Sequence, residues 1–190
     1  MSNTGVLIVG VGGQGTLLAS KVLGEVALRS GFDVKVSEVH GMAQRGGSVV
    51  THVKIGEKVY SPLVGKGQAD YILAFEKLEA LRWAQFLKDT GTIIVNDQRI
   101  LPMPVAQGTQ EYPLKIDKAL KETVTTHVVD AVRVAKDCGS QRATNIVLLG
   151  VLASKLDIKK DVWVEAIKEI VPKHTVDMNI KAFNEGYKMA

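Results

Sequence analysis

The chain has 190 residues, of which 46% are hydrophobic, 23% charged and 5% aromatic, and its formal net charge is +4. These values are typical of one globular domain and exclude a disordered chain. No apolar run approaches the ~20 residues of a membrane-spanning helix, and a single cysteine, Cys138, excludes an internal disulfide or a cysteine-held metal cluster. Scattered lysines and few aromatics do not favour a nucleic-acid surface, so we expect a cytoplasmic protein without nucleic-acid or membrane partners.

The first elements predict a strand–helix–strand unit. The apolar run 6–11 ends at a glycine turn and is typical of a buried strand. Residues 16–29 follow with the apolar period of a helix, and Gly31 stands where a helix ends. Residues 32–39 then alternate like a strand.

An antiparallel piece is expected next. Residues 48–55 alternate between apolar and polar side chains, which predicts a strand. Gly56-Glu57 follows, and a glycine-first pair between two extended runs is typical of a two-residue hairpin turn. We therefore expect a hairpin formed by 48–55 and the residues after Glu57.

The remainder predicts parallel strands joined by helices. Residues 69–76 and 92–97 are expected strands, with a helix over 77–89 between them and a surface connection over 98–113. Further elements are expected at 126–131 (strand) and at 133–139, 143–156, 161–171 and 176–187 (helices). Together these elements predict one α/β domain over residues 1–190. It is a three-layer, Rossmann-like domain whose sheet is mixed, mostly parallel, with the inserted antiparallel hairpin.

Residues 10–15 (GVGGQG) match the G-x-G-x-x-G fingerprint at Gly10, Gly12 and Gly15, between an expected strand and an expected helix. Glycines let backbone N–H groups approach an oxyanion, and the following helix directs its positive end there. Glu38, about 20 residues further on, supplies the acidic residue of a dinucleotide site. The alternative is that these glycines serve only a tight turn and close helix packing.

Residues 41–50 (GMAQRGGSVV) combine a backbone that bends freely with hydrogen-bond donors. Arg45 offers a guanidinium suited to phosphate or carboxylate, and Gln44 and Ser48 add neutral donors. Alone, the segment is equally consistent with a loop-to-strand corner carrying a surface arginine. Because both glycine segments are expected at the carboxyl edge of one sheet, together they predict a shared anion site.

The segments GVGGQG, SEVHGMAQRGGSVVTHVKIG, ADYILAFEKLEALR and GTIIVND resemble the gamma-type subunit of 2-oxoacid:ferredoxin oxidoreductases. HGMAQRGG is most similar to the indolepyruvate branch, whose beta subunit has this gamma-type domain. The resemblance implies oxidation of a 2-oxoacid with coenzyme A, giving carbon dioxide, acyl-CoA and reduced ferredoxin. It also implies an accessory subunit that is inactive alone.

The resemblance further implies how the cofactors are divided. Thiamine diphosphate and the iron–sulfur clusters are expected in a larger partner subunit, and ferredoxin is reached through the complex. Coenzyme A is expected as a transient substrate at this chain. Neither catalytic residues nor metal ligands are expected here. The cofactor-binding residues implied are Gly12, Gly13, Gln14, Gly15, Gln44, Arg45, Gly46, Gly47 and Ser48.

Two other functions remain open on the sequence. One is a free-standing NAD(P)-dependent oxidoreductase that uses Gly10, Gly12, Gly15 and Glu38, although no catalytic set is evident. The other is a structural scaffold without a ligand. His40 adjoins the second glycine segment and is a candidate for proton transfer, but such residues are more often simply hydrogen-bonded.

Overall fold

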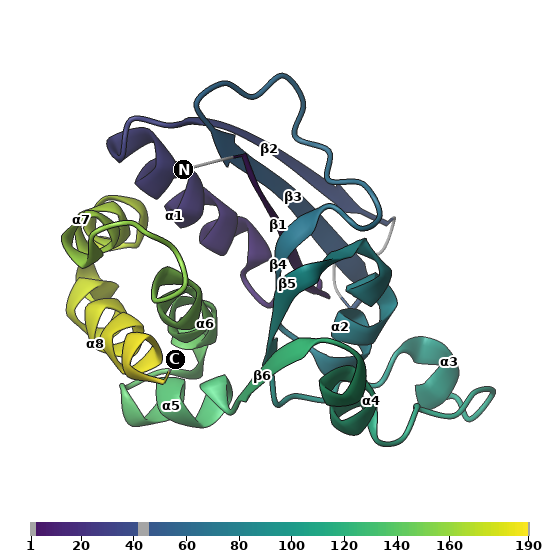
Figure 1. Cartoon of the computed structure of the whole chain (residues 1–190). Helices are drawn as coiled ribbons and strands as arrows, with labels where there is room; N and C mark the ends of the chain where they lie inside the picture. The colour runs from purple at the N-terminus through teal and green to yellow at the C-terminus, as the bar shows by residue number, and fades with distance from the viewer. Residues whose placement is uncertain (1–2, 42–45, 190) are drawn as a thin grey trace.

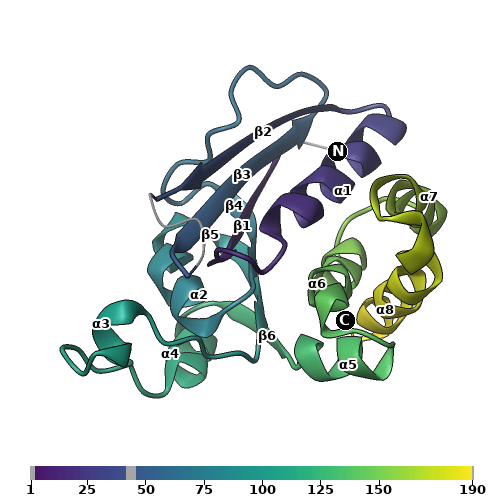
Figure 2. The ribbon, with the colours of Figure 1, turned by 180° about the vertical axis from the view of Figure 1, so that it is seen from behind.

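The structure, a computed structural model, describes residues 3–41 and 46–189 and shows a central sheet with helices on both sides (Figure 1; Figure 2). Over the described ranges the strands cross the sheet in the order β2-β3-β1-β4-β5-β6. Neighbouring strands are parallel except β3, which is antiparallel to both β1 and β2. The expected α/β class, with a mostly parallel sheet and an antiparallel pair, is confirmed. The strand bounds are β1 Thr4–Val11, β2 Asp33–His40, β3 Ser48–Gly56, β4 Ala69–Ala74, β5 Leu87–Asn96 and β6 Thr125–Val129.

Two groups of helices form the outer layers (Figure 1). Because successive strand residues point to opposite faces, Ile8 packs in the cluster beneath α1, whereas Leu7 and Val9 pack in the cluster beneath α2. One face is covered by α1 (Thr16–Arg29), α6 (Thr144–Ala153), α7 (Lys160–Ile170) and α8 (Val176–Lys188). The other face carries α2 (Lys77–Trp83) and α4 (Ile116–Thr123), while α3 (Met103–Ala106) and α5 (Ala131–Asp137) lie in connections. Short 3-10 turns occupy Ala84–Phe86, Gln141–Ala143 and Lys173–Thr175.

The antiparallel pair forms between different strands from those expected. Val53 of β3 lies opposite Val6 of β1 on one side and Val36 of β2 on the other. Both edges of β3 are therefore occupied, and the chain after Gly56 finds no free edge to pair with. The hairpin predicted at Gly56-Glu57 is wrong, since β3 pairs with β2 instead.

Two boundaries also differ from the sequence expectation. The helix expected over 77–89 ends at Trp83, and β5 begins at Leu87. Gly91 lies within β5, where an added Cβ would approach Ala69 O at 3.0 Å. The sheet register shifts between Ala69 and Tyr71 beside it, so a glycine is needed for this close approach. Helix α4 has no counterpart among the expected elements.

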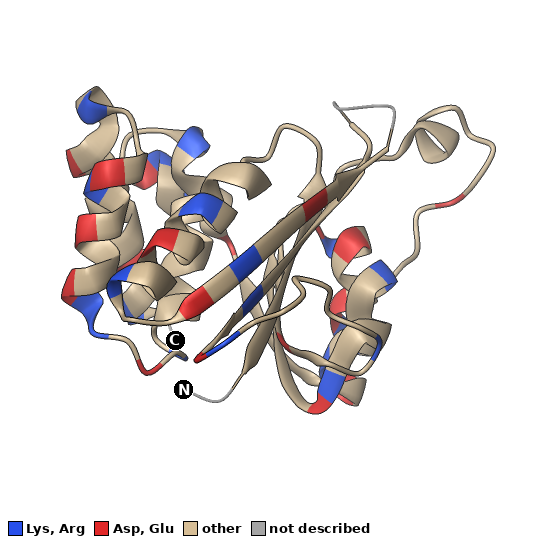
Figure 3. Cartoon of the chain, turned by 90° about the horizontal axis from the view of Figure 1, so that it is seen from above, with Lys and Arg blue, Asp and Glu red and all other residues tan. Residues whose placement is uncertain are grey.

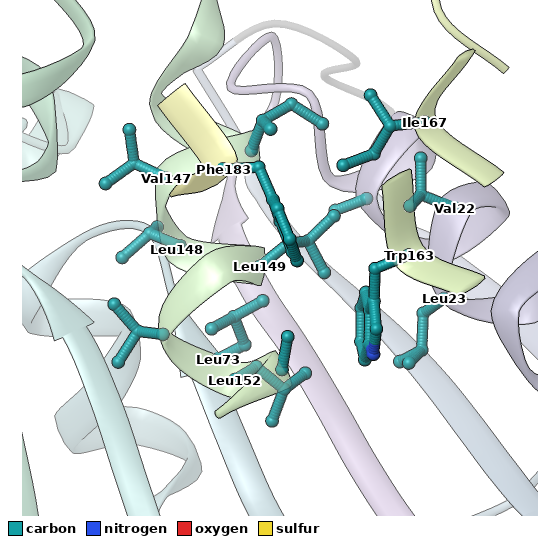
Figure 4. Packing of buried hydrophobic residues seen from close by; sticks show 14 of the residues in the cluster. Val22, Leu23, Leu73, Val147, Leu148, Leu149, Leu152, Trp163, Ile167 and Phe183 are labelled. Carbon is teal, nitrogen blue, oxygen red and sulfur yellow. The ribbon is translucent and has the colours of Figure 1, made fainter. Parts of the chain in front are cut away.

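Helices α6 and α8 pack with their backbones in near contact. An added Cβ at Gly186 would lie 2.0 Å from Val147 O, and one at Gly150 would lie 2.3 Å from Phe183 O. Beside them, Trp163 of α7 stacks on Phe183 with ring centroids 6.0 Å apart, and both side chains are buried (Figure 4). This layer anchors the start of α6, which borders the site described next.

Candidate functional site

The two glycine segments are joined by backbone hydrogen bonds. Gly12 N donates to Gly47 O at 2.8 Å, and Gly46 N donates to Gly12 O at 3.3 Å. The β1–α1 turn and the entry to β3 therefore form a single loop pair at the carboxyl end of β1. The expectation that the two segments meet is confirmed for these residues, whereas Gln44 and Arg45 lie outside the described residues.

Helix α1 begins at this loop pair with its positive end open. Gly15 takes the N-cap position with φ 85°, and Gly13 has φ 101°, so both backbones are left-handed and favour glycine. Among the described residues no side chain caps α1, and its first turn carries no acidic residue. The N–H groups of that turn are a suitable place for negative charge.

Gln14 uses its side-chain amide inside the chain. Its Oε1 accepts from Val11 N at 2.7 Å, and its Nε2 donates to Phe75 O at 3.0 Å and to Gln98 Oε1 at 3.1 Å. Asn96 Nδ2 donates to the same two oxygens, at 3.2 and 3.0 Å. This network joins the carboxyl ends of β1, β4 and β5, so Gln14 holds the loop in place.

Asn145, near the start of α6, supports the loop from the opposite side. Its Nδ2 donates to Gly15 O at 3.2 Å, and its Oδ1 accepts from Ile146 N at 2.9 Å. The residue is 2% exposed, and an added Cβ at Gly15 would lie 2.6 Å from Asn145 Nδ2. Asn145 is not among the site residues predicted from the sequence, although a lone amide in a strongly apolar helix is a usable signal.

A cleft of 670 Å³ opens between the loop pair and the start of α6. Helix α1 covers one face of the sheet and α2 the other, so β1 and β4 flank the point where open α/β sheets bind ligands. The residues that line the cleft include Gly13, Gly15, Phe75, Gln98, Arg142 and Asn145. Arg142 was also absent from the sequence-based candidates.

A second cleft of 430 Å³ lies on the other side of the glycine turn. Its lining includes Gly12, Gly15, Thr16, Glu38 and His40. Glu38 accepts a hydrogen bond from Thr51 Oγ1 at 3.2 Å, and His40 Nδ1 lies 3.1 Å from Gly41 O. The two clefts share the glycine turn, and among their described lining residues the larger cleft carries Arg142 and the smaller one Glu38.

The hydroxyl of Ser48 is hydrogen-bonded to a buried carboxylate. Its Oγ donates to Glu79 Oε2 at 2.5 Å, and Glu79 is 4% exposed on α2. Burial raises the pKa of Glu79, while the hydrogen bond from Ser48 and the charge of Arg82 oppose that rise. Ser48 thus fixes the point where the second glycine segment enters β3.

Neither metal-ligating clusters nor membrane helices are found in the described part of the chain. No group of three or more His, Cys, Asp or Glu side chains converges there in a way that could hold a metal ion. Over residues 3–41 and 46–189 no helix is both long enough and apolar enough to cross a bilayer.

Known proteins are similar to this chain along nearly its whole length. The family model described as "Pyruvate ferredoxin/flavodoxin oxidoreductase" matches residues 5–189. The "Indolepyruvate oxidoreductase subunit IorB" of Thermococcus kodakarensis is 40% identical over 196 residues, covering 100% of this chain and 97% of that protein.

Solved structures share the fold. A keto/oxoacid ferredoxin oxidoreductase gamma subunit from Geobacter sulfurreducens superposes with a TM-score of 0.74 at 26% identity, covering 98% of each chain. A 2-oxoglutarate:ferredoxin oxidoreductase from Magnetococcus marinus, solved with 2-oxoglutarate, coenzyme A and succinyl-CoA bound, gives a TM-score of 0.78 at 19% identity. That match covers 100% of this chain and 31% of the longer one, and at this identity it shows the fold alone.

Proposed function

The chain belongs to the pyruvate ferredoxin/flavodoxin oxidoreductase family, and on this premise we propose that it is the accessory, gamma-type subunit of a cytoplasmic indolepyruvate oxidoreductase. Its whole length forms one gamma-type domain. With a larger partner subunit it converts an arylpyruvate and coenzyme A to acyl-CoA and carbon dioxide, and the two electrons released pass to ferredoxin. The observation that carries the proposal is the hydrogen-bonded pair Gly12 and Gly47, in a chain similar over its full length to an indolepyruvate oxidoreductase subunit.

The redox cofactors belong to the partner in this proposal. A cysteine-held iron–sulfur cluster needs several thiolates, whereas this chain has only Cys138, which is buried. Thiamine diphosphate likewise resides in the larger subunit and supplies the decarboxylation chemistry there. The accessory subunit contributes to the site that coenzyme A reaches.

The residues of the loop pair divide into two roles. Gly12 N, Gly46 N and the side chains of Gln14 and Ser48 already donate within the chain, and Gly47 O accepts from Gly12. These five residues position the loops. The groups assigned to the phosphates of coenzyme A are the backbone N–H of Gly13 and Gly15 together with the side chains of Gln44 and Arg45.

The NAD(P) alternative is disfavoured by the strand order. In a dinucleotide site the acidic residue ends the strand adjacent to β1. Here β3 lies between β1 and β2, so Glu38 stands about 10 Å across the sheet from β1 instead of about 5 Å. Glu38 therefore does not occupy the position that the dinucleotide fingerprint gives to its acidic residue, at the end of the strand next to β1.

Arg45→Ala in the assembled complex tests the proposal. We expect the KM for coenzyme A to rise roughly 10- to 100-fold, because a charge-assisted hydrogen bond contributes about 1.5–3 kcal/mol. Steady-state kinetics with an arylpyruvate and ferredoxin, at varied coenzyme A, measure this KM. Arg29→Ala, at the far end of α1 and paired there with Glu25, is the matched control and should leave KM unchanged. Turnover by this chain alone, or an unchanged coenzyme A requirement in Arg45→Ala, would contradict the proposal.

A further inference from the structure

A further cleft, of 420 Å³, lies at the amino edge of the sheet, and we name it the amino-edge cleft. Its lining includes Thr4 and Gly5 at the start of β1 and Lys54 near the end of β3. Strand β1 runs from there to Val11, and its eight residues span about 23 Å. The amino-edge cleft is thus well separated from the glycine turn, and its volume is that of a small-molecule site.

Positive charge gathers at the amino-edge cleft. Lys54, Lys58 and Lys88 line it, and no carboxylate is among its described lining residues. Basic residues on neighbouring strands lie near the N-terminal end of the chain (Figure 3), and Lys35 of β2 stands directly opposite Lys54 of β3. Asp33 pairs with Lys35 at 2.7 Å, on the side away from Lys54 along β2. Like charges directly opposite one another destabilise a sheet, and a bound anion would offset that cost.

The charge of these lysines is only partly neutralised by the chain itself. Lys88 Nζ lies 2.5 Å from Asp70 Oδ1, which holds this lysine in place. Lys54 and Lys58 form no ion pair within residues 3–41 and 46–189. Burial lowers the pKa of His52, and the positive charge of Lys54 lowers it further. Two ammonium groups at the cleft therefore remain available to a ligand.

An exposed aromatic ring stands at the same cleft on an anchored loop. Val59 N donates to Asp33 Oδ2 at 2.8 Å, and Val64 N donates to His52 Nδ1 at 3.1 Å. Tyr60 lies between these two anchors, lines the cleft and is 84% exposed. A tyrosine held at the surface in this way offers its ring to a flat group of a ligand.

We propose that the amino-edge cleft is a second ligand site and binds a nucleoside diphosphate. Its phosphates contact Lys54 and Lys58, because adjacent phosphates match adjacent ammonium groups. Its base stacks on Tyr60, and Lys58 Nζ lies 5.2 Å from the centroid of that ring, so one ligand reaches both the cation and the ring. The inference does not depend on the proposed function.

Isothermal titration calorimetry of the purified chain with ADP and with inorganic pyrophosphate tests the inference. We expect Lys54→Met to raise the Kd for both probes roughly 10-fold, since each loses a charge-assisted contact. Tyr60→Ala should raise the Kd for ADP at least about fivefold and leave the Kd for pyrophosphate unchanged, because only ADP carries a base to stack. Tyr60 is exposed, and methionine keeps the aliphatic part of Lys54, so both variants should retain the wild-type circular dichroism spectrum.

Two control variants locate the bound ADP. Lys66→Met changes an exposed lysine of the same connection that does not line the cleft, and Arg142→Ala changes the cleft beside the start of α6. Both should leave the Kd for ADP unchanged. The inference is overturned if ADP does not bind, if Lys54→Met binds ADP as the wild type does, or if Arg142→Ala weakens ADP binding and Lys54→Met does not. Tighter binding of a polyglutamate peptide than of ADP would also overturn it, in favour of an acidic protein segment.

Discussion

Gly186→Ala is expected to destabilise the protein by ~3 kcal/mol or more. The added Cβ would lie 2.0 Å from Val147 O, 2.8 Å from Val147 C and 3.1 Å from Val147 Cα. These are backbone atoms of α6, so no side chain can rotate away and the two helices must separate. Separation also disturbs the contacts of Phe183, which is fully buried against Trp163. Urea unfolding of the purified chain, followed by circular dichroism, measures the loss.

Gly24→Ala is the control for helix glycines. Gly24 lies in α1, and an added Cβ there meets nothing within 4 Å. Alanine in a helix interior is favoured over glycine by about 0.5–1 kcal/mol, so this variant should be as stable as the wild type or more so. Equal stability of Gly186→Ala and Gly24→Ala would contradict the close approach of α6 and α8.

Gly15→Ala is expected to lower kcat/KM for coenzyme A on the order of 100-fold, because displacement of a binding group by about 1 Å has effects of that size. Gly15 has φ 85°, a left-handed backbone that costs an L-residue roughly 1–2 kcal/mol. Its new Cβ would also approach Asn145 Nδ2 to 2.6 Å, and buried Asn145 has little room to move. The first turn of α1 must therefore shift. Kinetics of the assembled complex at varied coenzyme A measure the change.

Gly31→Ala separates backbone strain from damage to the site. Gly31 has φ 79° and nothing within 4 Å of an added Cβ, and it follows the opposite end of α1. We expect this variant to lose a similar amount of stability to strain and to keep its coenzyme A kinetics. A comparable kinetic loss in both variants would show that Gly15 has no special role at the loop.

Patterns within a segment predicted correctly those helices and strands whose bounds are set by residues in or next to the same segment. Helix α1 runs over Thr16–Arg29 as the apolar period indicates, since the period lies within the segment itself and the Gly31 stop signal follows directly after its C-cap, Ser30. The hairpin failed for the opposite reason. Gly56-Glu57 is a sound local turn signal, but the pairing of β3 was decided by two strands earlier in the chain.

The site was predictable only in part for the same reason. The meeting of the two glycine segments followed from the rule that loops at the carboxyl ends of strands share an edge. The contact of Asn145 with Gly15 spans 130 residues, and no local pattern carries it. Arg142 reaches the cleft because α6 is packed against the sheet beside α1. The role of Gln14 inside the chain depends on Phe75 and Gln98, which the fold brings to it.

Hydrogen–deuterium exchange of the assembled complex, with and without coenzyme A, tests most directly whether the two glycine segments bind this substrate together. We predict that saturating coenzyme A slows amide exchange in residues 10–18 and in residues 41–50 at the same time. Protection confined to the larger subunit, with both segments exchanging at unchanged rates, would contradict a shared site at the loop pair of Gly12 and Gly47.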